Sequence, residues 1–227
     1  MNQPTISVNK LAEYIVSRAA RQRKILHDRK YPDPDFAMGA YYREAEECIQ
    51  QYLNDGADDQ SPLEMRLRVL NQASPEKIGT IRRINSNIAG IERFQTMLDD
   101  IDLKGMFATM GKHSAAKITI RNVAISVRPE IVLRGQNAKK KNVVGAMKLH
   151  LSTADKFTEE AAGFVSAITQ EYLRQHVLED GEIVFPEMCQ CVDVGNGEVW
   201  PGVKATAQRM KDVEANCQNI FDLWPSI

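Results

Sequence analysis

The hydrophobic residues of this chain change their spacing after Gly111, and this change constrains the fold more than any other feature. Before Gly111, apolar side chains recur every three or four residues, as they do on one face of an α-helix. The longest such stripe consists of Ile78, Ile81, Ile84, Ile88, Ile91, Phe94, Leu98 and Ile101. After Gly111, apolar and polar residues alternate, as they do along a half-buried strand. A helical first half followed by strands predicts an α+β fold.

The first hundred residues predict four helices, each marked by capping or helix-breaking residues. The expected segments are residues 7–27, residues 36–54, a helix that begins at Ser61, and a helix from Ser74 to about residue 102. Residues 56–62 are polar and lack periodicity, which is typical of a linker. We therefore expect an N-terminal helical domain over residues 1–60 and a second domain over residues 61–227.

The second half predicts a meander of three strands, then a helix, two further strands and a C-terminal helix. The meander is expected at residues 117–120, 125–133 and 143–151, and the following helix is capped by Thr158. The later elements are a strand at 183–194, a hairpin turn at 195–197, a strand at 198–200 and a helix at 205–224. From residue 75 onward the predicted order is α, β, β, β, α, β, β, α.

The composition excludes several classes of protein. Lys and Arg total 29 and Asp and Glu total 30, which excludes a histone-like protein that coats nucleic acid by a large positive excess. No apolar run approaches the roughly 20 residues that span a bilayer, and the first residues lack the features of a signal peptide. The four cysteines form no CxxC pair and are too few for a disulfide scaffold. We expect a soluble, cytoplasmic protein without a membrane partner.

Two of the predicted strands carry a motif with a charged residue. Pro129-Glu130 lies on the second strand, and Ala146-Met147-Lys148 lies on the third. Together with the order α-β-β-β-α-β, these motifs resemble the PD-(D/E)XK nuclease superfamily, whose second strand supplies an acid and whose third supplies an acid, a spacer and a lysine. The resemblance implies a restriction-endonuclease-like core and Mg²⁺-dependent hydrolysis of nucleic acid. It also implies that Glu130 binds the metal and that Lys148 orients the attacking water.

Ala146 departs from this pattern, because it stands where the superfamily carries its second metal-binding carboxylate. Mg²⁺ needs several oxygen ligands, so another residue would have to replace it. The candidates are Glu92 on the preceding helix as a metal ligand, His150 on the strand of Lys148, and Asp193 on a later strand. One alternative is an inactive nuclease-like fold that binds nucleic acid or protein as an adaptor. Another is an unrelated α+β domain whose sheet binds a partner chain.

The phase of the strands brings Glu130 and Lys148 together without use of the resemblance. Counting in steps of two places Glu130 on one face with Ser126 and Arg128, and Lys148 on one face with His150. An antiparallel hairpin would then make Glu130 and Lys148 neighbours across the two strands. On an exposed sheet this pair would be an ordinary salt bridge. Burial of the pair would instead indicate a functional or tightly constrained site.

Two basic segments are candidates for contact with nucleic acid, since clustered cations release counterions from phosphates. The candidate residues are Arg18, Arg21, Arg23 and Lys24 near the end of the first helix, and Lys139, Lys140 and Lys141 at the hairpin tip. The first segment has an alternative interpretation as a solvated helix end whose positive charge complements the helix dipole. The second has an alternative interpretation as a soluble turn.

Three further patterns are weaker. Gln170 and Tyr172 resemble a Gln and Tyr that recombination-type nucleases carry on this helix, but their spacing is shorter and Tyr172 falls on the apolar stripe, which indicates core packing. Cys189 and Cys191 have no histidine nearby, so packing is favoured over metal binding. The N-terminal segment also resembles uncharacterised bacterial proteins from defence-linked gene neighbourhoods, which implies a role in phage defence or in a mobile element.

Overall fold

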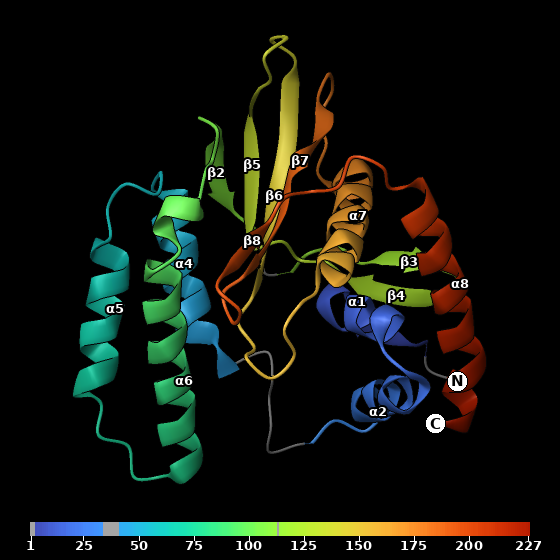
Figure 1. The fold of residues 1–227 in the computed structure, drawn as a ribbon, viewed down its shortest axis with the longest axis horizontal. Helices are drawn as coiled ribbons and strands as arrows, with labels where there is room; N and C mark the ends of the chain where they lie inside the picture. Colours follow the sequence, from blue (N-terminus) through green and yellow to red (C-terminus); the bar gives the residue numbers. More distant parts are fainter. Residues whose placement is uncertain (1–2, 34–40, 113) are drawn as a thin grey trace.

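The computed structural model describes residues 3–33, 41–112 and 114–227, and these residues form an α+β fold (Figure 1). Their helices are α1 (Val8–Val16), α2 (Ala19–Lys30), α4 (Arg43–Asn54), α5 (Ser61–Gln72), α6 (Ile78–Gln95), α7 (Glu159–His176) and α8 (Ala207–Leu223). Their strands are β1 (Thr5–Ser7), β2 (Phe107–Met110), β3 (Ile118–Ile120), β4 (Val123–Ser126), β5 (Ile131–Gln136), β6 (Asn142–His150), β7 (Ile183–Asp193) and β8 (Glu198–Trp200). The predicted fold class is confirmed.

Five strands form the central sheet in the order β2-β5-β6-β7-β8. β5 and β6 are an antiparallel hairpin, whereas β6 and β7 are parallel because α7 carries the chain across the sheet between them. A second sheet has the order β1-β4-β3, with β1 parallel to β4. From α6 onward the chain runs through β2, β3, β4, β5 and β6 to α7, and then through β7 and β8 to α8, so five strands precede α7 where three were expected.

The position of the first strand in this order is a correction. We expected residues 117–120 to pair in the meander, but β2 takes that place, and β3 and β4 pair in the smaller sheet. The expected strand at 125–133 is also wrong. It divides at Arg128, whose φ of 38° lies outside the β region, so β4 ends before this residue and β5 begins after it.

The helices follow the expected segments with changes at their ends. Ser7 accepts a hydrogen bond from the Lys10 N–H and caps α1, as predicted. The expected first helix is divided, because Ser17 and Arg18 have extended backbones between α1 and α2. Thr158 caps α7 as predicted. Residues 36–40 of the expected second helix lie outside the described residues, and residues 43–54 form α4.

Two helical layers cover the central sheet (Figure 1). α7 packs on one face together with α1 and α8, and α4, α5 and α6 form a layer on the other face. The first 60 residues contribute to both layers, since α1 and α2 lie in one and α4 in the other. α4 and α5, which flank the predicted domain boundary near residue 60, pack on each other. Among the described residues, none of the helices has both the length and the apolar character needed to cross a bilayer.

Candidate functional site

Glu130 and Lys148 lie together at the end of the β5–β6 pair that is opposite the hairpin tip. The Glu130 N–H donates to the Met147 carbonyl at 3.1 Å, which continues the strand register by one residue before β5. The Lys148 ammonium forms an ion pair with Oε1 of Glu130. Oε2 accepts a hydrogen bond from the Leu149 N–H at 2.6 Å. The predicted neighbourhood of Glu130 and Lys148 is therefore confirmed.

This ion pair is buried, with side-chain exposures of 3% for Glu130 and 11% for Lys148. Burial raises the pKa of the Glu130 carboxyl, while the Lys148 ammonium and the Leu149 amide act to lower it. A buried carboxylate costs several kcal/mol unless it is paired and hydrogen-bonded, and here both of its oxygens are engaged. Glu130 and Lys148 therefore form a buried ion pair in which both carboxylate oxygens have a hydrogen-bond partner.

The turn before β5 adds a second ion pair. Arg128 has the rare left-handed backbone, and its carbonyl accepts a hydrogen bond from the Lys148 ammonium at 3.3 Å. Its guanidinium binds Glu46 of α4, with Nη2 and Oε1 2.8 Å apart. The Glu46 charge also acts to raise the pKa of Glu130. Sequence reasoning missed Glu46 as a site residue, although the acidic face of its helix was visible as Glu44, Glu46 and Glu47.

Gly111 holds the other side of this turn. Its N–H donates to the Glu130 carbonyl at 2.8 Å, so the chain after β2 lies directly against the Pro129-Glu130 backbone. A Cβ atom at Gly111 would lie 1.8 Å from the Pro129 carbonyl oxygen. Only glycine fits this approach without a shift of the backbone.

The remaining metal-ligand candidates do not converge on Glu130. Ala146 is fully buried and pairs in register with Cys189 of β7. Glu92 is exposed on α6, in the layer on the other face of the sheet. Across the described residues, no group of three or more His, Cys, Asp or Glu side chains has a metal-binding arrangement.

The donors present at this end of the sheet do not fit a magnesium ion as they stand. Mg²⁺ prefers carboxylate oxygens, and the oxygens of Glu130 are engaged by Lys148 and Leu149. Ala146 offers no oxygen ligand. The magnesium site that the resemblance implies stays a prediction.

His150 holds the loop between β6 and α7. Its ring stacks on Phe157, with the centroids 4.0 Å apart and the planes 9° apart, and its Nε2 lies 2.6 Å from the Asp155 carbonyl oxygen. Asp193 pairs with His150 in register and accepts a hydrogen bond from the Phe157 N–H at 2.9 Å. Burial lowers the pKa of His150 and raises that of Asp193. Through these contacts His150 stabilises the conformation of the loop between β6 and α7.

Four charged side chains close a ring beside this loop. Asp155 binds both Lys10 and Arg21, at 2.9 and 2.7 Å, and Glu13 binds the same two cations, at 2.6 and 2.5 Å. The ring ties α1 and α2 to the loop after β6. Arg21, a predicted nucleic-acid contact, is therefore engaged within the protein.

We expect Asp155→Asn to lower the free energy of unfolding by about 1 kcal/mol at pH 7, because the Arg21 side chain is 37% exposed and solvent screens the ring. Burial acts to raise the pKa of Asp155, but Lys10 and Arg21 outweigh it and hold the pKa below its ordinary value. The stability from Asp155 is therefore complete above the unfolded value of about 3.9 and is lost as the pH falls below it. Urea titrations at pH 7 and pH 3 should show a smaller difference between wild type and variant at pH 3. An equal difference in the free energy of unfolding at both pH values would contradict the pairing of the Asp155 carboxylate with Lys10 and Arg21.

The other basic candidates divide between two ends of the sheet. Arg18 and Arg23 are exposed, and neither side chain has an ion pair or hydrogen bond with the described residues. Lys24 is paired with Asp28 at 2.9 Å on the surface of α2. The candidates Lys139, Lys140 and Lys141 are exposed at the β5–β6 tip, at the top of Figure 1. At about 3.3 Å per strand residue, the tip is more than 20 Å from Lys148, so the two basic segments do not form one patch.

The residues of the weaker sequence patterns take part in packing and hydrogen bonding within the fold. Gln170 is fully buried and donates to the Val203 carbonyl at 2.7 Å. Tyr172 is a buried residue of α7 and packs in the core, as expected. Cys189 and Cys191 are fully buried, and burial raises the pKa of Cys189 to about 12.

The Glu130–Lys148 pair, the Arg128–Glu46 pair and the charged ring of Asp155 lie at the same end of the central sheet. His150, two residues after Lys148, contacts the backbone of Asp155, so the ring lies close to the Glu130–Lys148 pair. No protein-family model matches the chain, and a search of curated proteins finds no match.

Proposed function

We propose that this chain binds nucleic acid through α2 and the loop after β6, and that it does so without hydrolysing the nucleic acid. The observation that supports this proposal is the pairing of Arg21 with Asp155, which fixes a cationic helix beside the motif end of the sheet. Arg21 serves as the anchor in this arrangement. Arg18 and Arg23, which are exposed on the same segment, supply the charge that meets phosphates.

The Glu130–Lys148 pair has a structural role in this proposal. Hydrolysis through a PD-(D/E)XK site would require free acidic oxygens, and the engaged oxygens of Glu130 together with the buried Ala146 argue against it. The resemblance to that superfamily then concerns the arrangement of strands and helices. A role in phage defence or a mobile element also belongs to the proposal and depends on the N-terminal resemblance alone.

The near-neutral chain is expected to bind nucleic acid locally and with a modest salt dependence. Each phosphate contact contributes a slope of about −0.9 to the dependence of log K on log salt for duplex DNA, so Arg18 and Arg23 predict a slope near −2. A cytoplasmic location is part of this proposal, since all four cysteines are free and buried and would remain reduced there.

The double variant Arg18→Glu/Arg23→Glu tests the proposed surface. We expect it to weaken binding of a fluorescein-labelled duplex or single-stranded oligonucleotide at least about tenfold in low salt, because repulsion replaces two phosphate contacts. The readout is fluorescence anisotropy over a range of salt concentrations.

The matched control is Lys139→Glu/Lys141→Glu, which changes the net charge by the same amount at the opposite end of β6. We expect this control to bind within about twofold of wild type, because the same change in net charge has only a small general effect on binding. An equal or larger loss in the control would place the surface elsewhere. Absence of salt-dependent binding by the wild type would reject the proposal.

A further inference from the structure

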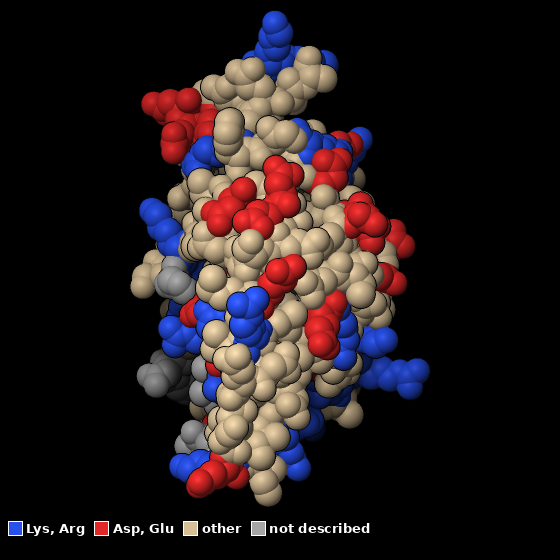
Figure 2. All heavy atoms as spheres, turned by 90° about the vertical axis from the view of Figure 1, so that its left-hand side faces the viewer, with Lys and Arg blue, Asp and Glu red and all other residues tan. Residues whose placement is uncertain are grey.

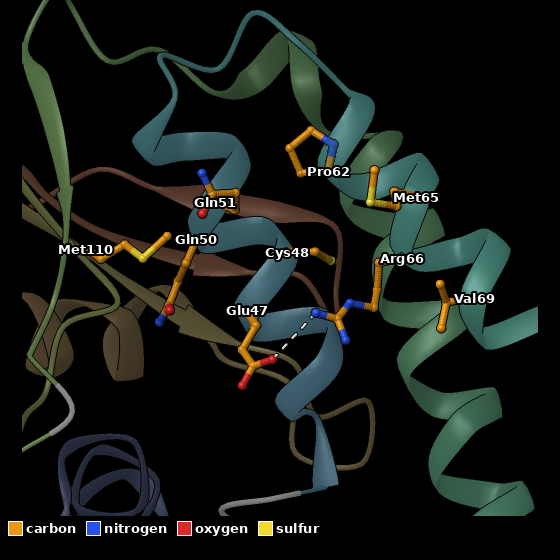
Figure 3. A pocket seen from close by; sticks show the side chains of 9 residues that line it. All are labelled: Glu47, Cys48, Gln50, Gln51, Pro62, Met65, Arg66, Val69 and Met110. Carbon is orange, nitrogen blue, oxygen red and sulfur yellow. Dashed lines mark ion pairs between the residues drawn. The ribbon is translucent and has the colours of Figure 1, made fainter.

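A groove opens on the three-helix layer, on the opposite face of the central sheet from α2. It lies between α4 and α5, with the edge strand β2 beside it, and has a volume of about 580 Å³ (Figure 3). Its lining residues are Glu47, Cys48, Gln50, Gln51, Pro62, Met65, Arg66, Val69 and Met110. The volume falls within the range of about 300–1,000 Å³ that binding pockets occupy.

Three of the residues that line this groove are large, exposed and apolar. Met65 and Val69 lie one helical turn apart on α5 and are 67% and 57% exposed, and Met110 of β2 is 42% exposed. Apolar side chains gathered in this way mark interaction surfaces more often than single exposed ones do. Flexible methionines also adapt to different partners.

α6 shows what kind of element packs on this pair of helices. It contacts both α4 and α5, and it buries Ile84, Ile91 and Phe94 in the shared core. In Figure 3, α6 lies behind α5, on the side away from the groove. A further helix in the groove would meet α4 and α5 on their other side by the same packing of apolar side chains.

The charged residues in the lining, Glu47 and Arg66, pair with each other at 3.6 Å, so the charge that selects a helix comes from one end of the layer. One end of the three-helix layer carries exposed carboxylates from the α4–α5 loop, the start of α5, and the end of α6 and the segment after it. They are Asp55, Asp58, Asp59, Glu64, Glu92, Asp99, Asp100 and Asp102. Between Asn54 and Met65 the chain has no Lys or Arg. Figure 2 shows the acidic side chains gathered in the upper half of this face.

This acidic end adjoins the groove and spans the layer. Gln51, which lines the groove, donates to Oδ1 of Asp55 at 2.8 Å. Gln95 at the end of α6 donates to Gln60 before α5 at 3.4 Å, which joins the two acidic segments. Glu92, the predicted metal ligand, belongs to this surface. The negative charge of this acidic end repels nucleic acid and favours a basic partner.

We propose that the groove binds an amphipathic helix of a partner protein, whose apolar side chains enter between α4 and α5 and whose lysine or arginine side chains face the acidic end. Helix-in-groove recognition uses apolar anchors at helical spacing, and the charges around the groove set the orientation of the helix and the rate of association. This inference is independent of nucleic-acid binding, and together the two surfaces would make the chain an adaptor.

A fluorescein-labelled model peptide tests this inference on the full chain. The probe is a helical peptide of about 18 residues with leucine on one face and lysine on the other. The control peptide carries glutamate in place of lysine on the same leucine face. We expect the lysine peptide to bind with a dissociation constant at least about tenfold lower than that of the glutamate peptide, because only its charge complements the acidic end.

Two independent pairs of substitutions locate the site. Met65→Ser/Val69→Ser removes exposed anchors, and Asp58→Lys/Glu64→Lys reverses charge at the acidic end. Each pair should weaken binding of the lysine peptide about tenfold. The matched controls Ile183→Ser/Phe221→Ser and Asp180→Lys/Asp222→Lys alter exposed residues elsewhere and should leave binding within about twofold.

Three results would overturn the inference: equal binding of the two peptides, no binding of the lysine peptide, or equal losses in the site and control variants. All of the substituted side chains are surface residues, and circular dichroism checks that each variant is folded. If one site pair fails to fold, the other pair decides. Met65→Ser/Val69→Ser leaves the net charge unchanged, so its oligonucleotide binding should match wild type, and failure of this inference and failure of the proposed function are distinguishable.

Discussion

Lys148→Met is expected to lower the free energy of unfolding by about 3–5 kcal/mol, because it leaves the Glu130 carboxylate buried without its cation. Methionine is close to lysine in length, so loss of packing contributes little to this effect. Urea titration at pH 7, followed by circular dichroism, measures the change. A loss below about 1 kcal/mol would show that Glu130 is hydrated or otherwise satisfied.

The pH dependence of this variant gives a second readout. Burial raises the pKa of Glu130, and the variant lacks the ammonium that acts to lower it, so the folded-state pKa rises further. A carboxyl with a raised folded-state pKa loses stability as the pH climbs above the unfolded value of about 4.3. We therefore expect the deficit to be small near pH 4 and to grow toward pH 8. A deficit that does not change with pH would contradict the buried ion pair.

The double variant Glu130→Leu/Lys148→Met is the control for the ion pair. Apolar replacements of a buried ion pair are often neutral or stabilising, whereas removal of one partner is not. We expect the double variant to recover most of the stability that Lys148→Met loses. If the two substitutions cost the sum of their separate effects, the two side chains do not interact.

Gly111→Ala is expected to have the second largest effect, a loss of about 3 kcal/mol. The new methyl group would meet the Pro129 carbonyl oxygen, which is a backbone atom and moves only if the turn before β5 moves with it. Movement of the turn would also weaken the hydrogen bond from the N–H at position 111 to the Glu130 carbonyl. Thermal and urea unfolding both measure the effect.

Gly79→Ala is the matched control for this substitution. Gly79 lies in α6, and a Cβ atom there meets no atom within 4 Å. Alanine in a helix is favoured over glycine by about 0.5–1 kcal/mol, so this variant should be more stable than wild type. A similar destabilisation by both alanines would contradict the contact between Gly111 and the turn.

The pairing of Glu130 with Lys148 could be predicted because it depends on local alternation. The expected strand at 125–133 was wrong, yet Glu130 still sits one residue before β5 and opposite Lys148 in register. Alternation within a single hairpin fixes which side chains face each other, even when the strand ends are misplaced. The burial of the pair was not predictable, since it depends on helices distant in the sequence.

The features that the sequence did not reveal depend on long-range contacts. β2 is a four-residue edge strand with exposed side chains, too short to show alternation. β1 pairs with β4 through Thr5–Ser7 and residues more than 100 positions away, and Glu46 reaches Arg128 across 82 positions. No pattern within a short window marks such partners. The same limit concealed the engagement of Arg21 by Asp155.

The most direct test of the central claim compares the wild type with Glu130→Leu/Lys148→Met in one assay of binding and cleavage. Both proteins are mixed with a labelled duplex or single strand in Mg²⁺ or Mn²⁺, and anisotropy is followed by electrophoresis of the same samples. If the pair is structural and α2 binds the nucleic acid, both proteins bind with the same salt-dependent affinity and leave the strand intact. Metal-dependent cleavage by the wild type that is lost in the variant would contradict the account.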